Sequence, residues 1–153
     1  DSGCHHGGLD LVPFAWHDLL GTPWMLHGRT KDGMDCSTVA EEVLSRLGYD
    51  PPASNPYRLE GSAGDQGEIG AYLGLLEAAY TRLGSDASLA TERGDLVLCG
   101  DENGLARHLY ILVEPARGTF LTAAHDHGVI AVRRFMLRQI AGVYRIKEAA
   151  WSQ

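Results

Sequence analysis

The segment Gly28–Gly48, "GRTKDGMDCSTVAEEVLSRLG", places a cysteine at the first turn of a predicted helix. Asp35 is a favourable N-cap and Gly48 a favourable stop, so we expect a helix from about Cys36 to Leu47. Its apolar face comprises Val39, Ala40, Val43, Leu44 and Leu47. Cys36 is then either a small buried apolar residue or a thiol activated by the helix N-terminus. If Asp35 turns back onto the first-turn amides, those amides and that of Cys36 are also candidates for stabilising an oxyanion.

The bulk composition is that of one ordinary globular domain. The chain has 153 residues, of which 44% are hydrophobic and 22% charged. We expect a flexible leader over residues 1–9 and a single domain over 10–153. No apolar run is long enough for a membrane span. The net charge of −7 disfavours nucleic acid as a partner, and "AVRRFMLRQ" is the only local cluster of arginines.

The cysteines are best interpreted one at a time. There are three of them and no Cys-x-x-Cys pair, so neither a disulfide framework nor a structural zinc site is expected. We predict no metal and no cofactor. Cys99 lies within the apolar run "DLVLCG" and reads as a buried core residue.

The order of secondary structure predicts an α+β fold. Helical patterns cover residues 10–21, 36–47 and 68–84. Short β-rich runs separated by turn residues follow: "GDLVLCG", "RHLYILVE", "GTFLTAA", "GVIAVRRF" and "GVYRIKE". We therefore expect N-terminal helices packed on an antiparallel sheet.

Two motifs resemble the NlpC-type cell-wall cysteine peptidases of the papain-like superfamily. "GTPWMLHGRTKDGMDCS" matches that family's Gly-x-Pro and Asp-Cys-Ser pattern at Gly21, Pro23, Gly28, Gly33 and Asp35 to Ser37. "GDLVL" and "RHLYILVE" resemble the strands around its catalytic histidine. The resemblance spans about residues 10–146 and implies a divergent member of the family.

The resemblance implies nucleophilic catalysis. Cys36 would attack an amide carbonyl, and His108 would take up and return the proton. The family's third polar residue falls on the strand after His108. A hairpin symmetrical about Pro115 would place Thr122 opposite His108, with His125 as the alternative third residue. The expected substrate contacts are Trp24, His27, Asp35 and Ser37.

Several residues depart from the family pattern. Trp24 stands where the family has tyrosine, His27 replaces one glycine of a pair, and Thr38 replaces the glycine after Cys-Ser. Together with Thr122, these departures leave the substrate and the activity more open than the fold.

The function implied is cleavage of an amide in peptidoglycan stem peptides, of the D-glutamyl–diamino acid endopeptidase type. The resemblance places such a chain in a secreted, periplasmic or virion-associated setting, as in a phage tail or a secreted toxin system. A larger assembly would then supply targeting. Two alternatives remain: a catalytically inactive structural or adaptor subunit that keeps the fold, and a papain-like acyltransferase.

Overall fold

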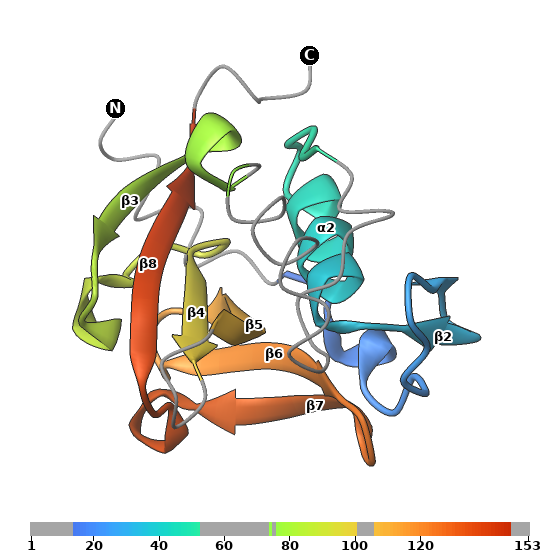
Figure 1. Cartoon of the computed structure of the whole chain (residues 1–153). Helices are drawn as coiled ribbons and strands as arrows, with labels where there is room; N and C mark the ends of the chain where they lie inside the picture. Colours follow the sequence, from blue (N-terminus) through green and yellow to red (C-terminus); the bar gives the residue numbers. More distant parts are fainter. Residues whose placement is uncertain (1–13, 53–73, 75, 101–105, 148–153) are drawn as a thin grey trace.

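The computed structural model describes residues 14–52, 74, 76–100 and 106–147, and its centre is a six-stranded antiparallel sheet. The strand order is β3-β8-β4-β5-β6-β7 (Figure 1). These strands are β3 (Tyr80–Gly84), β4 (Leu96–Gly100), β5 (Ala106–Glu114), β6 (Thr119–Ala124), β7 (Gly128–Arg133) and β8 (Ile140–Ile146).

The remaining elements are short apart from one helix. Helix α2 (Cys36–Arg46) follows a small hairpin made of β1 (Arg29–Thr30) and β2 (Gly33–Met34). Three 3-10 turns complete the set: η1 (His17–Leu19), η3 (Ala87–Leu89) and η4 (Arg134–Met136). None of the helices in the described ranges is long and apolar enough to cross a membrane.

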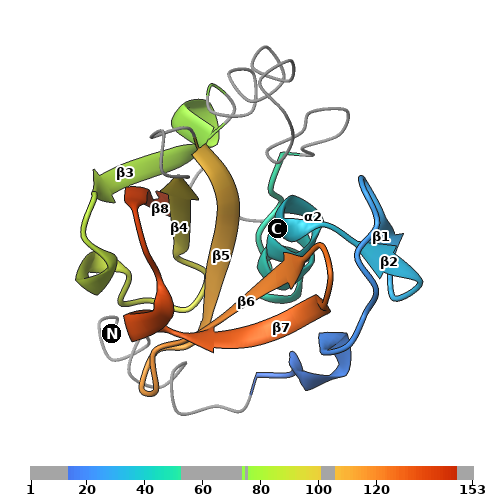
Figure 2. The same cartoon turned by 60° about the horizontal axis from the view of Figure 1, so that its bottom comes forward.

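The curved sheet separates two apolar clusters, and α2 packs on β5 and β6 from one side (Figure 2). The first cluster joins the apolar face of α2 to alternate residues of β5, namely Leu109, Ile111 and Val113. The second cluster gathers residues of opposite alternation, such as Val97, Cys99 and Leu112. Because side chains on a strand alternate between faces, β4 and β5 contribute to both clusters.

The predicted α+β class is confirmed, and the five expected β-rich runs all form strands. Consecutive strands β4 to β7 are neighbours in the sheet, while β8 returns to lie between β3 and β4.

Two expected helices require correction. The helical pattern over 68–84 fails at its end, because Tyr80–Gly84 pairs with β8 and the helix of residues 76–79 ends there. Pairing with a neighbouring strand overrides local propensity. Of the expected helix over 10–21, the described part contains only the turn η1. The leader expected over residues 1–9 lies outside the described residues.

A buried carboxylate joins the start of β4 to β8. Asp95 is almost fully buried, and it accepts hydrogen bonds from the amides of Thr91 and Glu92, both at 3.0 Å. Arg145 donates to the same carboxylate from Nε at 2.8 Å and from Nη2 at 2.7 Å. These bonds to Asp95 raise the pKa of Arg145 above its ordinary value. The ion pair thus fixes the strand that precedes His108 in the sheet.

Replacing Asp95 by Asn is therefore expected to lower the free energy of unfolding by about 1–3 kcal/mol, because one buried acceptor would become a donor facing Arg145. Urea denaturation followed by circular dichroism measures the change. Asp86→Asn is the matched control, since Asp86 is exposed and its carboxylate accepts from Ser88, through the amide and the side chain. Equal losses in the two variants would contradict the role given to Asp95.

Candidate functional site: the start of helix α2 and the His108–Thr122 pair

Asp35 organises the start of α2. Its Oδ1 accepts from the amides of Ser37 and Thr38 at 3.0 and 2.9 Å and from the Ser37 hydroxyl at 2.8 Å. Its Oδ2 accepts from the amide of His27 at 2.7 Å. The Thr38 hydroxyl accepts from the amide of Asp35 at 2.9 Å, which completes a capping box. The prediction that Asp35 turns back onto the first turn is confirmed.

This cap engages two of the amides expected to stabilise an oxyanion. The amides of Ser37 and Thr38 were among the candidate donors, but both already bond to Asp35. Ser37 also uses its hydroxyl on Asp35. Asp35 and Ser37 therefore act within the described structure as a helix cap, and the expectation that they contact substrate has no support from these bonds.

The loop before α2 is held in an uncommon backbone conformation. His27 has a φ of 61°, a region that costs free energy for residues with a Cβ. Its amide reaches Asp35 from that conformation. A Cβ on the neighbouring Gly28 would collide with the carbonyl of Gly33, so only glycine fits there. The glycine pattern of the motif thus has a steric origin.

Cys36 is the first residue of α2 and is only 3% exposed. It belongs to the apolar cluster between α2 and the sheet. Cys99, the other cysteine in the described residues, lies on β4 in the second cluster. Burial raises the pKa of the Cys99 thiol to about 11, which keeps it protonated and unreactive near neutral pH.

His108 lies near the start of β5 and contacts Thr122 of β6. The Thr122 Oγ1 is 2.6 Å from His108 Nε2, and it donates to the Leu109 carbonyl at 2.8 Å. Cys99 is the cross-strand partner of His108. The ring of Tyr110 lies edge-on to the imidazole, with centroids 5.0 Å apart. Sequence reasoning missed Tyr110, although its position two residues after His108 puts it on the same strand face.

The hairpin register differs from the expected one. Ile111 pairs with Leu121 and Leu112 with Phe120, and a bulge shifts the register before Glu114 pairs with Thr119. Continued along the strands, this register sets Thr122 opposite Tyr110, and His108 is its diagonal neighbour. The expectation of direct opposition is wrong because the hairpin is centred beyond Pro115 and a bulge shifts its register by one residue, yet diagonal neighbours are within reach of long side chains.

The first turn of α2 and His108 lie at the same end of the sheet. Trp24 forms a bridge with Met34, directly before the cap of α2, and its ring lies tilted against that of His125, with centroids 4.3 Å apart. His125 follows β6, and Thr122 of that strand contacts His108. At the other end, Leu44 of α2 lies near Gly94, which precedes β4. The helix direction therefore brings Cys36, not Arg46, toward the imidazole.

His125 takes no part in the contact with Thr122. Its side chain is 70% exposed, its Nδ1 lies 3.5 Å from Asp126 Oδ1, and its ring contacts that of Trp24 at a tilt. Trp24 and His27 both lie in the loop beside the start of α2. Among the described residues, no group of three or more His, Cys, Asp and Glu side chains is placed to hold a metal ion.

No protein-family model and no curated protein sequence matches the chain. Solved structures do match. The chain is similar to an NLP/P60 family protein from Staphylococcus aureus subsp. aureus Mu50, with a TM-score of 0.50 and 19% identity. The match covers 84% of this chain and 38% of that protein.

Two further structures match with lower TM-scores. The NlpC/p60 domain of the peptidoglycan hydrolase SagA has a TM-score of 0.49 and 19% identity, over 86% of this chain and 91% of that domain. NlpC1 from Trichomonas vaginalis has a TM-score of 0.48 and 17% identity, over 88% of this chain and 41% of that protein. The resemblance inferred from the sequence motifs is thus confirmed at the level of the fold: the chain has the NlpC/P60 fold.

Proposed function

We propose that the chain is a papain-like cysteine hydrolase that cleaves an amide bond in peptidoglycan stem peptides. Cys36 is the nucleophile, His108 the general base and Thr122 the residue that orients the imidazole. The observation that supports this assignment is the Thr122–His108 contact of 2.6 Å at the end of the sheet where α2 begins.

The hydrogen bonds of Thr122 select one tautomer of His108. A threonine hydroxyl has one proton, and Thr122 donates it to the carbonyl of Leu109. Toward His108 Nε2 the same oxygen can therefore only accept, so Nε2 carries the ring proton. In the neutral imidazole this leaves the lone pair on Nδ1, which is the atom that acts as the base.

The reaction follows from these roles. The Sγ proton of Cys36 moves to His108 Nδ1, and the thiolate attacks the scissile carbonyl. The C–N bond breaks as Nδ1 returns its proton to the leaving nitrogen, which leaves a thioester on Cys36. Water then attacks the thioester, again with Nδ1 as base, and releases the acid product and the thiol. An amine in place of water would give acyl transfer instead.

The choice of substrate rests on the motif resemblance together with the shared fold. The motif around Asp35 and Cys36 is similar to that of cell-wall cysteine peptidases, and the NLP/P60 neighbour shares the architecture. The bond between D-glutamate and a diamino acid is the target we propose, with Trp24 and His27 in the loop beside the site as substrate contacts. A larger assembly, in a phage tail or a secreted toxin system, would supply targeting.

A specific observation favours the alternative of an inactive structural subunit. His108 is paired with Cys99 and lies beside Tyr110, both on the face of the second cluster. Cys36 lies in the first cluster, under α2. The thiol and the imidazole therefore come from opposite faces of the sheet. A contact between them would have to form past the end of the sheet, which is more demanding than a contact across one face.

Digestion of purified peptidoglycan tests the proposal. Wild-type protein is expected to release fragments cut within the stem peptide, identified by mass spectrometry, and Cys36→Ala is expected to release none because the nucleophile is gone. Cys99→Ala is the matched control, because it removes the other buried cysteine of the described residues. Fragments should still form with this variant. Turnover by folded Cys36→Ala would refute the mechanism.

Alkylation by iodoacetamide separates the hydrolase from the inactive subunit. At mildly acidic pH, Cys36 is expected to react faster in the native chain than in the urea-unfolded chain, because only folding supplies the helix N-terminus and the base. Cys99 should show the reverse order, since burial raises its pKa to about 11. Peptide mapping by mass spectrometry assigns each modified cysteine. If Cys36 is alkylated more slowly in the native chain than in the unfolded chain, the result favours the inactive subunit.

Thr122→Val tests the tautomer. Without the hydroxyl, the bond to Nε2 is lost, and the ¹⁵N shifts of His108 are expected to change from the Nε2–H tautomer toward a mixture. Hydrolysis should fall together with this change, while stability falls by about 1 kcal/mol for the lost bond to Leu109. Thr122→Ser is the control, because it keeps the hydroxyl and should keep the tautomer. An unchanged ¹⁵N spectrum in the valine variant would exclude the positioning role.

A further inference from the structure

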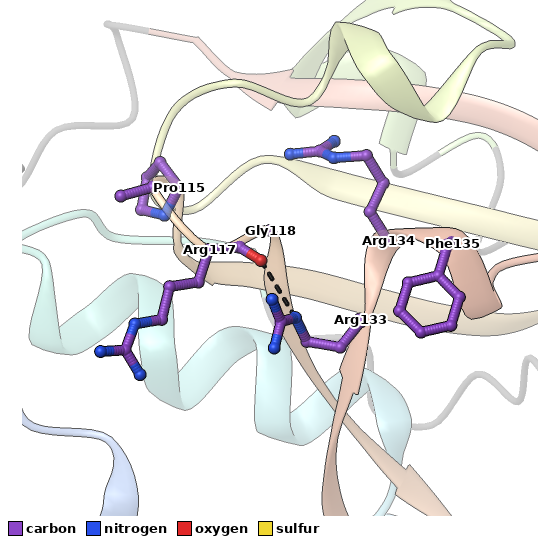
Figure 3. Close-up of a pocket in the computed structure, with 7 residues that line it drawn as sticks. Pro115, Arg117, Gly118, Arg133, Arg134 and Phe135 are labelled. Carbon is purple, nitrogen blue, oxygen red and sulfur yellow. Dashed lines mark hydrogen bonds between the residues drawn. The ribbon is translucent and has the colours of Figure 1, made fainter.

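One pocket is lined with arginines and shares no residue with the candidate active site. Figure 3 shows the residues that line it. It has a volume of about 430 Å³ and is formed by the turn between β5 and β6 and by the end of β7 with η4. The lining residues are Pro115, Ala116, Arg117, Gly118, Arg133, Arg134 and Phe135. This is the arginine cluster that stands out in the sequence as "AVRRFMLRQ", joined in space by Arg117.

Backbone carbonyls hold two of the guanidinium groups in place. Arg133 Nε donates to the carbonyl of Arg117 at 3.1 Å, and Arg134 Nη1 donates to the carbonyl of Ala87. Arg134 also lies over the ring of Phe120, 5.2 Å from its centroid. Ordering these side chains beforehand reduces the entropy that a ligand would otherwise have to offset.

The charge of the pocket is not balanced by its own walls. None of the described residues that line it is Asp or Glu. Among the described residues, Glu114 approaches Arg117 to 4.0 Å, and that arginine is 76% exposed. Positive charges gathered in this way repel one another, so an anionic ligand gains both attraction and relief of repulsion.

Apolar side chains border the arginines. Phe135 is 75% exposed and Met136 is 51% exposed, although both are large hydrophobic residues. An exposed aromatic ring beside guanidinium groups is the composition of a protein-binding hot spot. A ligand that suits this surface carries carboxylates together with an apolar side chain.

We propose that this pocket binds an acidic peptide segment of a partner protein, with the carboxylates on Arg117, Arg133 and Arg134 and an apolar side chain on Phe135. The net charge of −7 argues for a short segment rather than an anionic membrane or polymer. An extended anionic surface would be repelled by the negative charge on the rest of the molecule. A segment inside the pocket lies within about 10 Å of the arginines, a distance at which salt does not yet screen the attraction between charges.

The pocket and the candidate active site occupy opposite ends of the β5–β6 hairpin. His108 lies near the start of β5, and the pocket begins at Pro115, just after that strand ends. Strand residues rise by about 3.3 Å each, so roughly 20 Å separates the two sites. A segment bound in the pocket would leave the site around Cys36 uncovered, and the two sites can be tested independently.

Fluorescence anisotropy tests this proposal with the folded chain. The probe is a short fluorescein-labelled peptide of Asp and Glu with one central Leu, compared with the same peptide in Asn and Gln. We expect binding of the acidic peptide alone, weakening as salt is added. Arg133→Gln should weaken it roughly three- to tenfold, because one charge-assisted contact is lost. Phe135→Ala should weaken binding of the Leu peptide and have little effect on the same peptide with Gly in place of Leu.

Arg82→Gln is the matched control. Arg82 is also a surface arginine that donates to one backbone carbonyl, that of Ala141, but it lies on β3 outside the pocket. Binding should be unchanged in this variant. Equal weakening by Arg82→Gln and Arg133→Gln, or no binding of the acidic peptide, would overturn the proposal. So would sedimentation of the protein with phosphatidylglycerol–phosphatidylcholine vesicles in the absence of peptide binding.

Discussion

The carboxylate of Asp35 is the constraint on which the candidate site depends. It holds the amides of Ser37 and Thr38 at the start of the helix and, with its second oxygen, the amide of His27 in the preceding loop. One buried side chain thus fixes both where α2 begins and where the loop passes it. The cost is a left-handed backbone at His27, which the buried cap offsets. Cys36, as the first residue of the helix, is positioned by this arrangement.

The sheet supplies the other half of the site, and there too one side chain holds two groups. The hydroxyl of Thr122 serves the Leu109 carbonyl and the His108 ring at once, which couples the imidazole to the backbone of its own strand. A single hydroxyl proton is sufficient for both contacts. The hydroxyl donates it in a hydrogen bond to the carbonyl, so toward the imidazole its oxygen can only accept. The bulge near Glu114 makes the contact diagonal, so the irregularity of the hairpin is part of the geometry of the pair.

Local signals in the sequence predicted the features that depend on neighbouring residues: the cap at Asp35, the helix after it, and the strands bounded by turn residues. Features that depend on distant residues were not predictable in the same way. The segment Tyr80–Gly84 has a helical pattern, and only pairing with β8 makes it a strand. The hairpin register depends on one extra residue at a bulge, which the alternation of β5 and β6 does not reveal. The expectation that the first-turn amides stabilise an oxyanion is weakened for Ser37 and Thr38, which both donate to Asp35, and stays a prediction for the amide of Cys36.

Charge is distributed unevenly over the molecule, and the net charge alone does not show this. The net charge is −7, yet Arg117, Arg133 and Arg134 meet at one pocket because a hairpin turn and the end of β7 converge there. The candidate active site at the other end of the hairpin contains a thiol, an imidazole and a hydroxyl, none of which needs a positive surface. An antiparallel hairpin has two ends with independent side chains, so the residues around one can vary without disturbing the other. The basic pocket and the His108–Thr122 pair therefore lie at the two ends of the β5–β6 hairpin without sharing a side chain.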